Sequence, residues 1–245
     1  GLSPAAVEEV WMGCANQAGE DNRNVARMAL LLAGLPETVP GATVNRLCGS
    51  GMEAVSAAAR AIKAGEIGLA IAGGVESMTR APMVMPKATT AFARTAEIAD
   101  STIGWRFVNP KMKAAYGIDS MPETAENLAD EYGISRADQD ALAHRSHTLA
   151  TQAWQSGVMK HEVMTAHVEP YSRFLEMDNN IRQDSKLESY AKLKPVFDRV
   201  HGSVTAANAT PLTDGASAVL MMTESRAKAL GYTPLGYIRS YAFAA

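Results

Sequence analysis

Cys48 is the residue whose surroundings best suit covalent chemistry, because a glycine-rich turn and a helix follow it. The segment NRLCGSGMEAV places Gly49 and Gly51 directly after the cysteine. A thiol attacks as its thiolate, and a helix N-terminus favours the thiolate through the partial positive charge of its free N–H groups. The glycines allow a tight turn and the close approach of a substrate. We therefore predict that Cys48 is a nucleophile at the tip of a strand-turn-helix, as in the nucleophile elbow of serine hydrolases.

Two other interpretations of this segment stay open. A single cysteine is more often a buried structural residue than a nucleophile. Residues 49–54, GSGMEA, also match the G-x-G-x-x-A fingerprint of dinucleotide-binding folds. That fingerprint requires an acidic residue at the end of the second strand, where this sequence has Gly73 and Gly74, and Glu66 comes before the strand. The missing acid makes nucleotide binding the weaker hypothesis.

The segments around Cys48 predict a strand, a helix and a second strand. The strand-like ATVNRL leads into the turn, and apolar residues fall on one face of a helix predicted over 51–64. Ser50 and Glu53 have the spacing of a capping box, and Gly65 can end the helix. The apolar run 69–72 predicts a buried strand, which completes a βαβ unit.

The rest of the chain predicts an α/β core interrupted by a helical and irregular insertion. The further predicted elements are a helix at 23–33, an irregular segment at 83–116, helices at 123–132, 136–155 and 224–230, and strands at 203–207, 216–222 and 234–243. Strand character thus occurs on both sides of a long helical region. We expect residues 1–82 and 200–245 to form the core domain and residues 83–199 to be inserted into it.

Composition and charge narrow the possible partners. The 245 residues are 47% hydrophobic, with a formal net charge of -3, so we expect no nucleic-acid partner. No apolar run is long enough to cross a membrane, and we expect no membrane insertion. Two cysteines are too few for a disulfide framework, which favours a reducing, cytoplasmic location. The chain starts without Met and without the pattern of a secretory signal, and we expect an upstream segment to be missing.

Three segments together resemble the thiolases. NRLCGSGMEAV is similar to their active-site cysteine segment, AIAGGVESMTRAP to their GG-x-E-S-M region, and SVTAANATPLTDGASAVLMM to their later T-A-x-N segment. The chain before about residue 140 resembles 3-oxoadipyl-CoA thiolases of aromatic catabolism, and the chain after it resembles the thiolase subunit of the fatty-acid β-oxidation complex. The resemblance implies an α/β fold with a layered α/β/α core, an inserted loop domain, and a second thiolase half that is absent from these residues.

The resemblance also assigns roles to individual residues. It implies that Cys48 carries the acyl group and that its backbone amide contributes to an oxyanion hole. It implies contacts with coenzyme A at five further positions: Met121, Arg182, Phe197, Ala206 and Thr210. Without the family, Met121 and Phe197 could equally be core residues, and Arg182 a solvated charge. Ser120 stands where acetoacetyl-specific members often have His, as in members that act on longer acyl chains.

Coenzyme A is implied as a co-substrate, with acyl-CoA molecules as the ligands and no permanently bound cofactor. We expect no metal site, because no Cys or acidic ligand stands at a matching spacing to the histidines. The five histidines are His144, His147, His161, His167 and His201. None has the G-H-P context of the thiolase base, and His144 with His147 indicates a solvated helix face.

Thiolase chemistry also requires a His that activates the nucleophile, a second Cys, and a water held by Asn. The family supplies them in N-E-A-F, G-H-P and C-x-G-G segments, and none of these occurs in the 245 residues. We therefore expect these residues to be the first half of a thiolase, without its initial strand and helix. On their own they are expected to be inactive or nearly so.

The full-length enzyme is expected to be a homodimer or homotetramer, with a β-oxidation subunit as a candidate partner. A non-catalytic acyl-CoA-binding module is the alternative, and a ketosynthase fits the T-A-x-N segment less well.

Overall fold

The computed structural model describes residues 1–17, 19–161, 163, 165–168 and 173–244. The chain forms two compact units. The core unit consists of Gly1–Arg106 and Leu212–Ala245, and the inserted unit consists of Phe107–Pro211. These boundaries differ from the expected ones, because residues 83–106 group with the core unit and residues 200–211 with the inserted unit.

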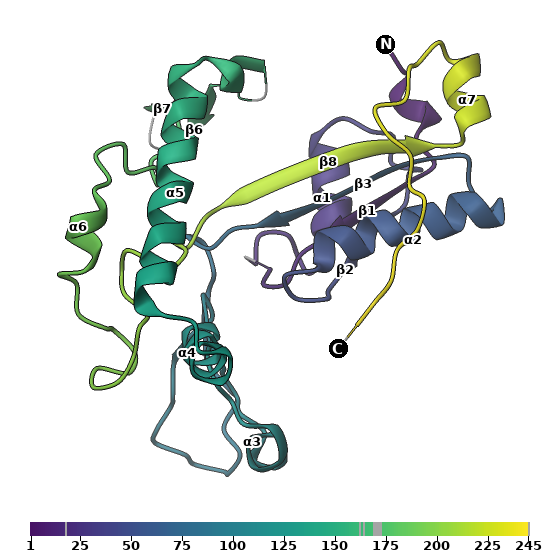
Figure 1. Ribbon diagram of the computed structural model, residues 1–245. Coiled ribbons are helices and arrows are strands. Elements are labelled where there is room, and N and C mark those ends of the chain that lie inside the picture. The colour runs from purple at the N-terminus through teal and green to yellow at the C-terminus, as the bar shows by residue number, and fades with distance from the viewer. Residues whose placement is uncertain (18, 162, 164, 169–172, 245) are drawn as a thin grey trace. The chain divides into compact units, whose positions relative to one another are not determined.

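The core unit is built on a four-stranded sheet with the strand order β2-β1-β3-β8 (Figure 1). The strands are β1 Glu9–Gly13, β2 Gly41–Val44, β3 Leu69–Glu76 and β8 Gly215–Met222. The first three run parallel, and β8 pairs antiparallel with β3. Helix α2, Ser50–Ala64, connects β2 to β3 and ends at Gly65 with a φ of 77°, as predicted. The predicted βαβ unit is therefore present, with β1 lying between its two strands.

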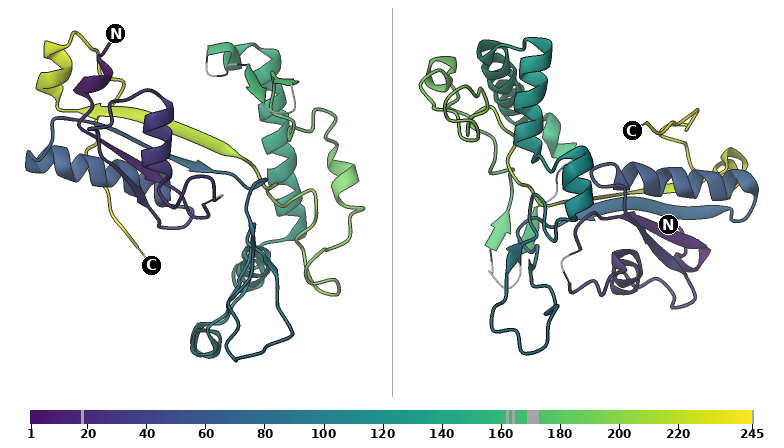
Figure 2. Two further views of the ribbon diagram at one scale, coloured as in Figure 1. Left: turned by 180° about the vertical axis from the view of Figure 1, so that it is seen from behind. Right: turned by 90° about the horizontal axis from the view of Figure 1, so that it is seen from below.

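Alternate residues of β1 face opposite sides of the sheet, and a helix covers each side (Figure 2). Val10 and Met12 share an apolar cluster with Leu30 of α1, Val25–Leu32. Trp11 packs instead against the cluster on the other side, together with Val55 of α2. Because successive strand side chains point to opposite faces, two covering layers are needed. The core is the layered α/β/α arrangement that the family resemblance implies.

Strand β3 is longer than predicted, because it continues through Gly73 and Gly74 to Glu76 instead of ending at residue 72. A Cβ atom at Gly73 would lie 2.2 Å from the carbonyl oxygen of Ser217 in β8. The glycine therefore allows a close approach of the neighbouring strand and does not end β3.

The strand predicted over 234–243 is wrong, because residues 232–244 have no regular secondary structure. This segment follows α7, Glu224–Ala229, which agrees with the helix predicted at 224–230. Figure 1 shows the segment passing over α2. The guanidinium of Arg46 lies 4.2 Å from the centre of the Phe243 ring, and that of Arg60 lies 5.7 Å from the Tyr241 ring. The segment therefore packs through contacts between arginines and aromatic rings and not through strand pairing.

The inserted unit is mainly helical. Its elements are α3 Pro110–Tyr116, α4 Met121–Tyr132, α5 Arg136–Gln155, the 3-10 helix Val158–His161, β6 Ala166–Val168, β7 Arg173–Leu175 and α6 Leu187–Tyr190. Helices α4 and α5 agree with the prediction because their ends carry strong signals. Ser120 and Glu123 form a capping box at the start of α4, and Gly133 ends that helix with a φ of 64°. In the segment predicted as irregular, α3 is an addition, capped by Asn109.

The strand predicted over 203–207 is also wrong, because side chains occupy the N–H groups that a strand ladder would need. The carboxylate of Glu126 accepts the N–H of Ser203 at 2.8 Å and that of Val204 at 2.9 Å. The Asn208 Oδ1 accepts the N–H of Thr205 at 2.7 Å. With these donors satisfied, the segment forms a turn within the inserted unit.

The first turn of α2 lies directly against the backbone of β1 and β3. A Cβ atom at Gly13 would lie 2.2 Å from the carbonyl carbon of Ser50 and 2.4 Å from the nitrogen of Gly51. A Cβ atom at Gly74 would lie 3.2 Å from the Gly51 Cα. Glycine at position 13 is therefore required for this contact, since the opposing atoms are backbone atoms and cannot move aside like a flexible side chain.

We predict that Gly13→Ala lowers the free energy of unfolding by about 2 kcal/mol, because the added methyl group overlaps the backbone of α2. Gly215→Ala is the matched control in the same sheet, since no atom lies within 4 Å of its Cβ position. Urea unfolding followed by circular dichroism measures both variants. Equal stability of Gly13→Ala and the parent chain would contradict the proposed contact.

Candidate active site

The turn that carries Cys48 connects β2 to α2 and is closed by backbone hydrogen bonds. The N–H of Gly49 donates to the Arg46 carbonyl, and the N–H of Ser50 donates to the Leu47 carbonyl, each at 3.0 Å. Leu47 has a φ of 48°, in the left-handed region that few side chains adopt. Cys48 is exposed on this turn, immediately before the helix N-cap.

The predicted capping box at Ser50 and Glu53 is wrong. Helix α2 begins at Ser50 with Gly49 as its N-cap, and no side chain caps it. The Ser50 hydroxyl instead accepts the N–H of Arg46 at 2.8 Å and donates to the Leu47 carbonyl at 2.5 Å. The Glu53 carboxylate accepts the Nε–H of Arg46 at 2.7 Å. Both side chains therefore stabilise the turn before the helix.

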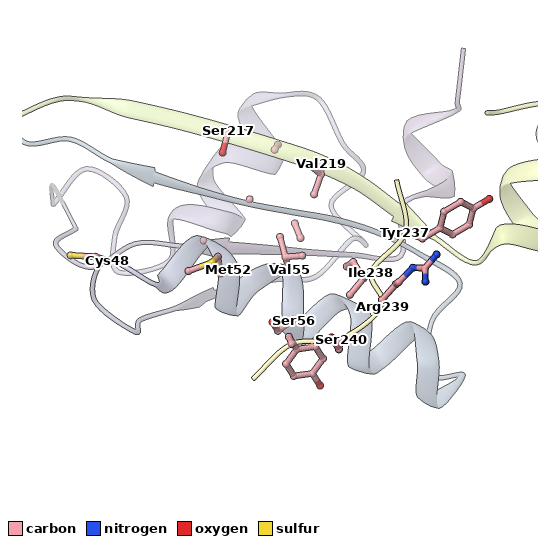
Figure 3. A pocket seen from close by; sticks show the side chains of 15 residues that line it. Cys48, Met52, Val55, Ser56, Ser217, Val219, Tyr237, Ile238, Arg239 and Ser240 are labelled. Atoms are coloured by element: carbon pink, nitrogen blue, oxygen red, sulfur yellow. The ribbon is translucent and has the colours of Figure 1, made fainter. Parts of the chain in front are cut away.

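A cavity of about 680 Å³ lies beside α2 in the core unit, and Cys48 is one of its lining residues. Figure 3 shows Cys48 at the N-terminal end of the helix, with Met52 and Val55 further along it. Val219 of β8 and residues 237–241 also line the cavity. Its size is within the range of small-molecule sites, roughly 300–1,000 Å³. The arrangement combines one exposed thiol with a largely apolar space.

Cys14 has the opposite surroundings from Cys48. It is 4% exposed, and its thiol donates to the Glu76 carboxylate with an S–O distance of 3.7 Å. Burial, the Glu76 charge and this hydrogen bond raise the pKa of Cys14 to about 11. The Cys14 thiol therefore stays neutral near neutral pH, and Cys48 is the cysteine available for reaction.

An acidic residue does stand at the end of β3, since that strand reaches Glu76. Contrary to the prediction from sequence, the dinucleotide fingerprint therefore does have an acid at the end of its second strand. The Glu76 carboxylate accepts the N–H of Ala15 at 2.9 Å and that of Asn16 at 3.0 Å, besides the Cys14 thiol. Glu76 is thus engaged in fixing the segment after β1, and these contacts argue against its use in holding a ribose.

A second cavity, of about 430 Å³, lies in the inserted unit and brings four predicted substrate contacts together. Arg182, Phe197, Ala206 and Thr210 all line it. Phe197 is 45% exposed, so it is not a core residue. The cavity combines a cation, an aromatic ring and small side chains, a set that suits a long ligand with a charged end.

The fifth predicted contact, Met121, does not line this cavity. It is the first residue of α4 and is 67% exposed. The cavity includes His147 and Asn180 in addition, which motif comparison does not identify. The His147 Nδ1 accepts the N–H of Arg182 at 3.2 Å, so His147 faces the cavity and not solvent alone. The sequence gives no signal for this, because a polar helix face has the same pattern whether it meets solvent or a cavity.

A buried polar network holds the Ala206–Thr210 side of this cavity. The Asn208 amide donates to Asp140 Oδ1 at 2.9 Å and to the Ser203 carbonyl at 3.0 Å. Asp140 is 4% exposed and also binds Arg136. Asn208 therefore connects the turn at 203–210 to helix α5, and Gln139 of that helix adds a hydrogen bond to the Ser203 hydroxyl at 2.9 Å.

Residues 1–225 match the protein family described as "Thiolase, N-terminal domain". The chain is 54% identical to the beta-ketoadipyl-CoA thiolase of Pseudomonas putida over 230 residues, which cover 93% of this chain and 57% of that protein. It is 50% identical to the 3-ketoacyl-CoA thiolase of Shewanella amazonensis, covering 100% of this chain and 58% of that protein. The crystal structure of human mitochondrial 3-ketoacyl-CoA thiolase in complex with CoA matches with a TM-score of 0.83 and 32% identity, covering 96% of this chain and 57% of that one.

The chain therefore belongs to the thiolase family, within its N-terminal domain. It spans somewhat more than half the length of the thiolases it matches. In the part of the chain that the structure describes, no group of three His, Cys, Asp or Glu side chains is placed to hold a metal ion. No helix among the described residues is both long and apolar enough to cross a membrane.

We predict that iodoacetamide at about pH 8 alkylates Cys48 at least about tenfold faster than Cys14. The reaction at Cys14 should accelerate only as the pH approaches 11, the raised pKa of that thiol. The pKa of Cys14 is raised only in the folded state, so the unfolded chain loses its thiol proton first as the pH rises. The free energy of unfolding should therefore fall as the pH rises from about 8.5, the ordinary pKa of a cysteine, towards 11. Peptide mapping by mass spectrometry separates the two cysteines, and equal rates would count against an exposed nucleophile.

We predict that Asn208→Ala lowers the free energy of unfolding by about 2 kcal/mol, because Asp140 and the Thr205 N–H lose a partner inside the unit. Asn179→Ala is the matched control, since Asn179 is exposed and lines the same cavity. Its effect should stay within about 0.5 kcal/mol. Denaturant unfolding compares the two variants, and an equal effect would contradict the role given to Asn208.

Proposed function

We propose that this chain carries the nucleophile of an acyl-CoA acyltransferase, with Cys48 as the acyl carrier. The Cys48 thiolate attacks the 3-oxo carbonyl of a 3-oxoacyl-CoA, and the carbon–carbon bond on the thioester side of that carbonyl breaks. The departing acetyl-CoA carbanion takes up a proton, and the acyl group remains on Cys48 as a thioester. A coenzyme A thiol then loses its proton and attacks this thioester, which forms a shortened acyl-CoA and regenerates the Cys48 thiolate. The reverse direction is a Claisen condensation.

The exposed position of Cys48 just before α2 is the observation that carries this proposal. The free N–H groups of the first helical turn favour both a thiolate and the negative oxygen that develops during attack. The resemblance to thiolases assigns the remaining work to a G-H-P histidine and a C-x-G-G cysteine of the second thiolase half. Cys48 and its backbone amide supply the attack and part of the oxyanion hole.

We propose that the cavity of the inserted unit binds coenzyme A as co-substrate. Arg182 offers a guanidinium group for the nucleotide end, since arginine recognises phosphate oxygens well. Phe197, Ala206 and Thr210 offer a surface of low polarity with one hydroxyl for the pantetheine arm. Met121 is a separate proposed contact for that arm, on the exposed start of α4.

The names of the bacterial relatives support a 3-oxoacyl-CoA as substrate, with the beta-ketoadipyl group as the first candidate. Ser120 at the start of α4 is consistent with an acyl chain longer than acetoacetyl. We place the reaction in the bacterial cytoplasm and propose a homodimer or homotetramer as the assembly. The outer edge of β2 supports an assembly, because no strand of the described chain pairs with it.

We predict that prolonged incubation with excess acetyl-CoA slowly leaves an acetyl thioester on Cys48 and releases coenzyme A, because a thiolate can exchange with a thioester without the histidine assigned to the second half. Mass spectrometry detects the adduct on the Cys48 peptide, and it should be absent in Cys48→Ser. Arg182→Gln should weaken coenzyme A binding about tenfold, because a charged hydrogen-bond donor is lost. Calorimetric titration measures that binding.

The chain alone should show little or no thiolytic cleavage of a 3-oxoacyl-CoA.

The outcomes separate the candidate functions. Coenzyme A binding without a Cys48 adduct would favour a non-catalytic acyl-CoA-binding module. If coenzyme A does not bind and no adduct forms, both candidate functions are overturned. Robust thiolytic turnover by these residues would contradict the assignment of base and acid to a second thiolase half.

A further inference from the structure

Glu53 lies where two arginines from different parts of the chain meet. Its side chain is 12% exposed, whereas those of Arg46 and Arg60 are 54% and 46% exposed. One carboxylate oxygen accepts the Nε–H of Arg46 at 2.7 Å, and the other accepts an N–H of Arg60 at 2.9 Å. Hydrogen bonds from Arg60 and from Arg46 hold the pKa of Glu53 below its ordinary value. The carboxylate is therefore charged at neutral pH.

The two arginines differ in what they connect to Glu53. Arg60 belongs to α2, so its contact with Glu53 stays within one helix. Arg46 belongs to the turn that carries Cys48, two residues before the thiol, and its contact joins that turn to the helix. The backbone N–H of Arg46 also donates to the Ser50 hydroxyl, and its carbonyl accepts the N–H of Gly49. Both the backbone and the side chain of Arg46 are thus bound to the start of α2.

The turn needs such an anchor because its middle is poorly supported. Leu47 is 72% exposed and holds a left-handed backbone conformation, and Cys48 after it is exposed as well. Side-chain packing therefore contributes little to the order of these two residues. Hydrogen bonds from the neighbouring residues fix their positions instead.

We propose that Glu53 is a positioning residue that acts through Arg46 to hold the Cys48 thiol at the N-terminus of α2. This inference rests on the proposed function of Cys48 as the acyl carrier. Glu53 does not touch the reacting atoms. It keeps the turn against the helix end, where the free N–H groups favour the thiolate.

Hydrogen exchange of the backbone amides tests the proposal directly. In Glu53→Gln and in Arg46→Gln, exchange at residues 47–50 should be about tenfold faster than in the parent chain, with no change in the middle of α2. Arg60→Gln is the matched control, because it removes the other partner of Glu53 and, like Arg46→Gln, a contact with the aromatic rings of residues 241–243, but it keeps the bond between Arg46 and Glu53. The double variant Glu53→Gln with Arg46→Gln should exchange no faster than either single variant.

The rate of Cys48 alkylation at a fixed pH of about 8 separates positioning from simple charge removal. Loss of a nearby negative charge alone would raise the rate, because negative charge opposes the thiolate. Loss of positioning takes the thiol away from the helix end, and we expect Glu53→Gln to lower the rate about threefold. If thermal denaturation shows that Glu53→Gln does not fold, Arg46→Gln replaces it in the same measurements, because Arg46 is half-exposed and its loss is less disruptive.

Faster alkylation of Cys48 in Glu53→Gln, unchanged exchange at residues 47–50 in Arg46→Gln, or equal effects of Arg60→Gln would overturn the proposal. These measurements use alkylation and exchange, and they do not depend on acyl transfer. If no acetyl thioester forms on Cys48 while the exchange results hold, the proposed function fails and the structural role of Glu53 stands.

Discussion

The contact between the first turn of α2 and the two central strands determines where Cys48 lies. Gly13 and Gly74 remove the side chains that would keep the helix away from the sheet, so backbone meets backbone at Ser50 and Gly51. Hydrogen bonds from Ser50 and the ion pair between Arg46 and Glu53 then hold the turn against the helix end. The position of the thiol therefore also depends on two glycines in β1 and β3 that are distant from it in sequence.

The same thiol chemistry is suppressed at Cys14 and left available at Cys48. Cys14 is buried beside the Glu76 carboxylate, and both burial and the negative charge oppose ionisation. Cys48 stands on an exposed turn before a helix, where the free N–H groups of the first turn favour negative charge. Residue type alone therefore says little about reactivity, and the surrounding charges and exposure separate a structural cysteine from a candidate nucleophile.

Sequence patterns predict the elements that are locally determined and fail where distant groups compete. Helices α4 and α5 follow from their capping residues and closing glycines, which act within a few residues. The capping box at Ser50 fails because Arg46 and Arg60 bind Glu53. The strand at 203–207 fails because Glu126, far earlier in the chain, takes its N–H groups. His147 in the second cavity is missed because a polar face of α5 has the same pattern whether it meets solvent or a cavity.

The segment 49–54 shows how one backbone requirement can serve two chemistries. A dinucleotide site and a nucleophile turn both need glycines where a strand meets a helix, because in each case a ligand approaches the helix N-terminus closely. An acid at the end of the next strand does not decide between them, since β3 does end at Glu76. The decision lies in the partners of that acid, because a carboxylate already bound to two backbone N–H groups and a thiol has little capacity left for a ribose. Without a dinucleotide at this helix end, the glycine turn is best explained by the exposed cysteine that precedes it.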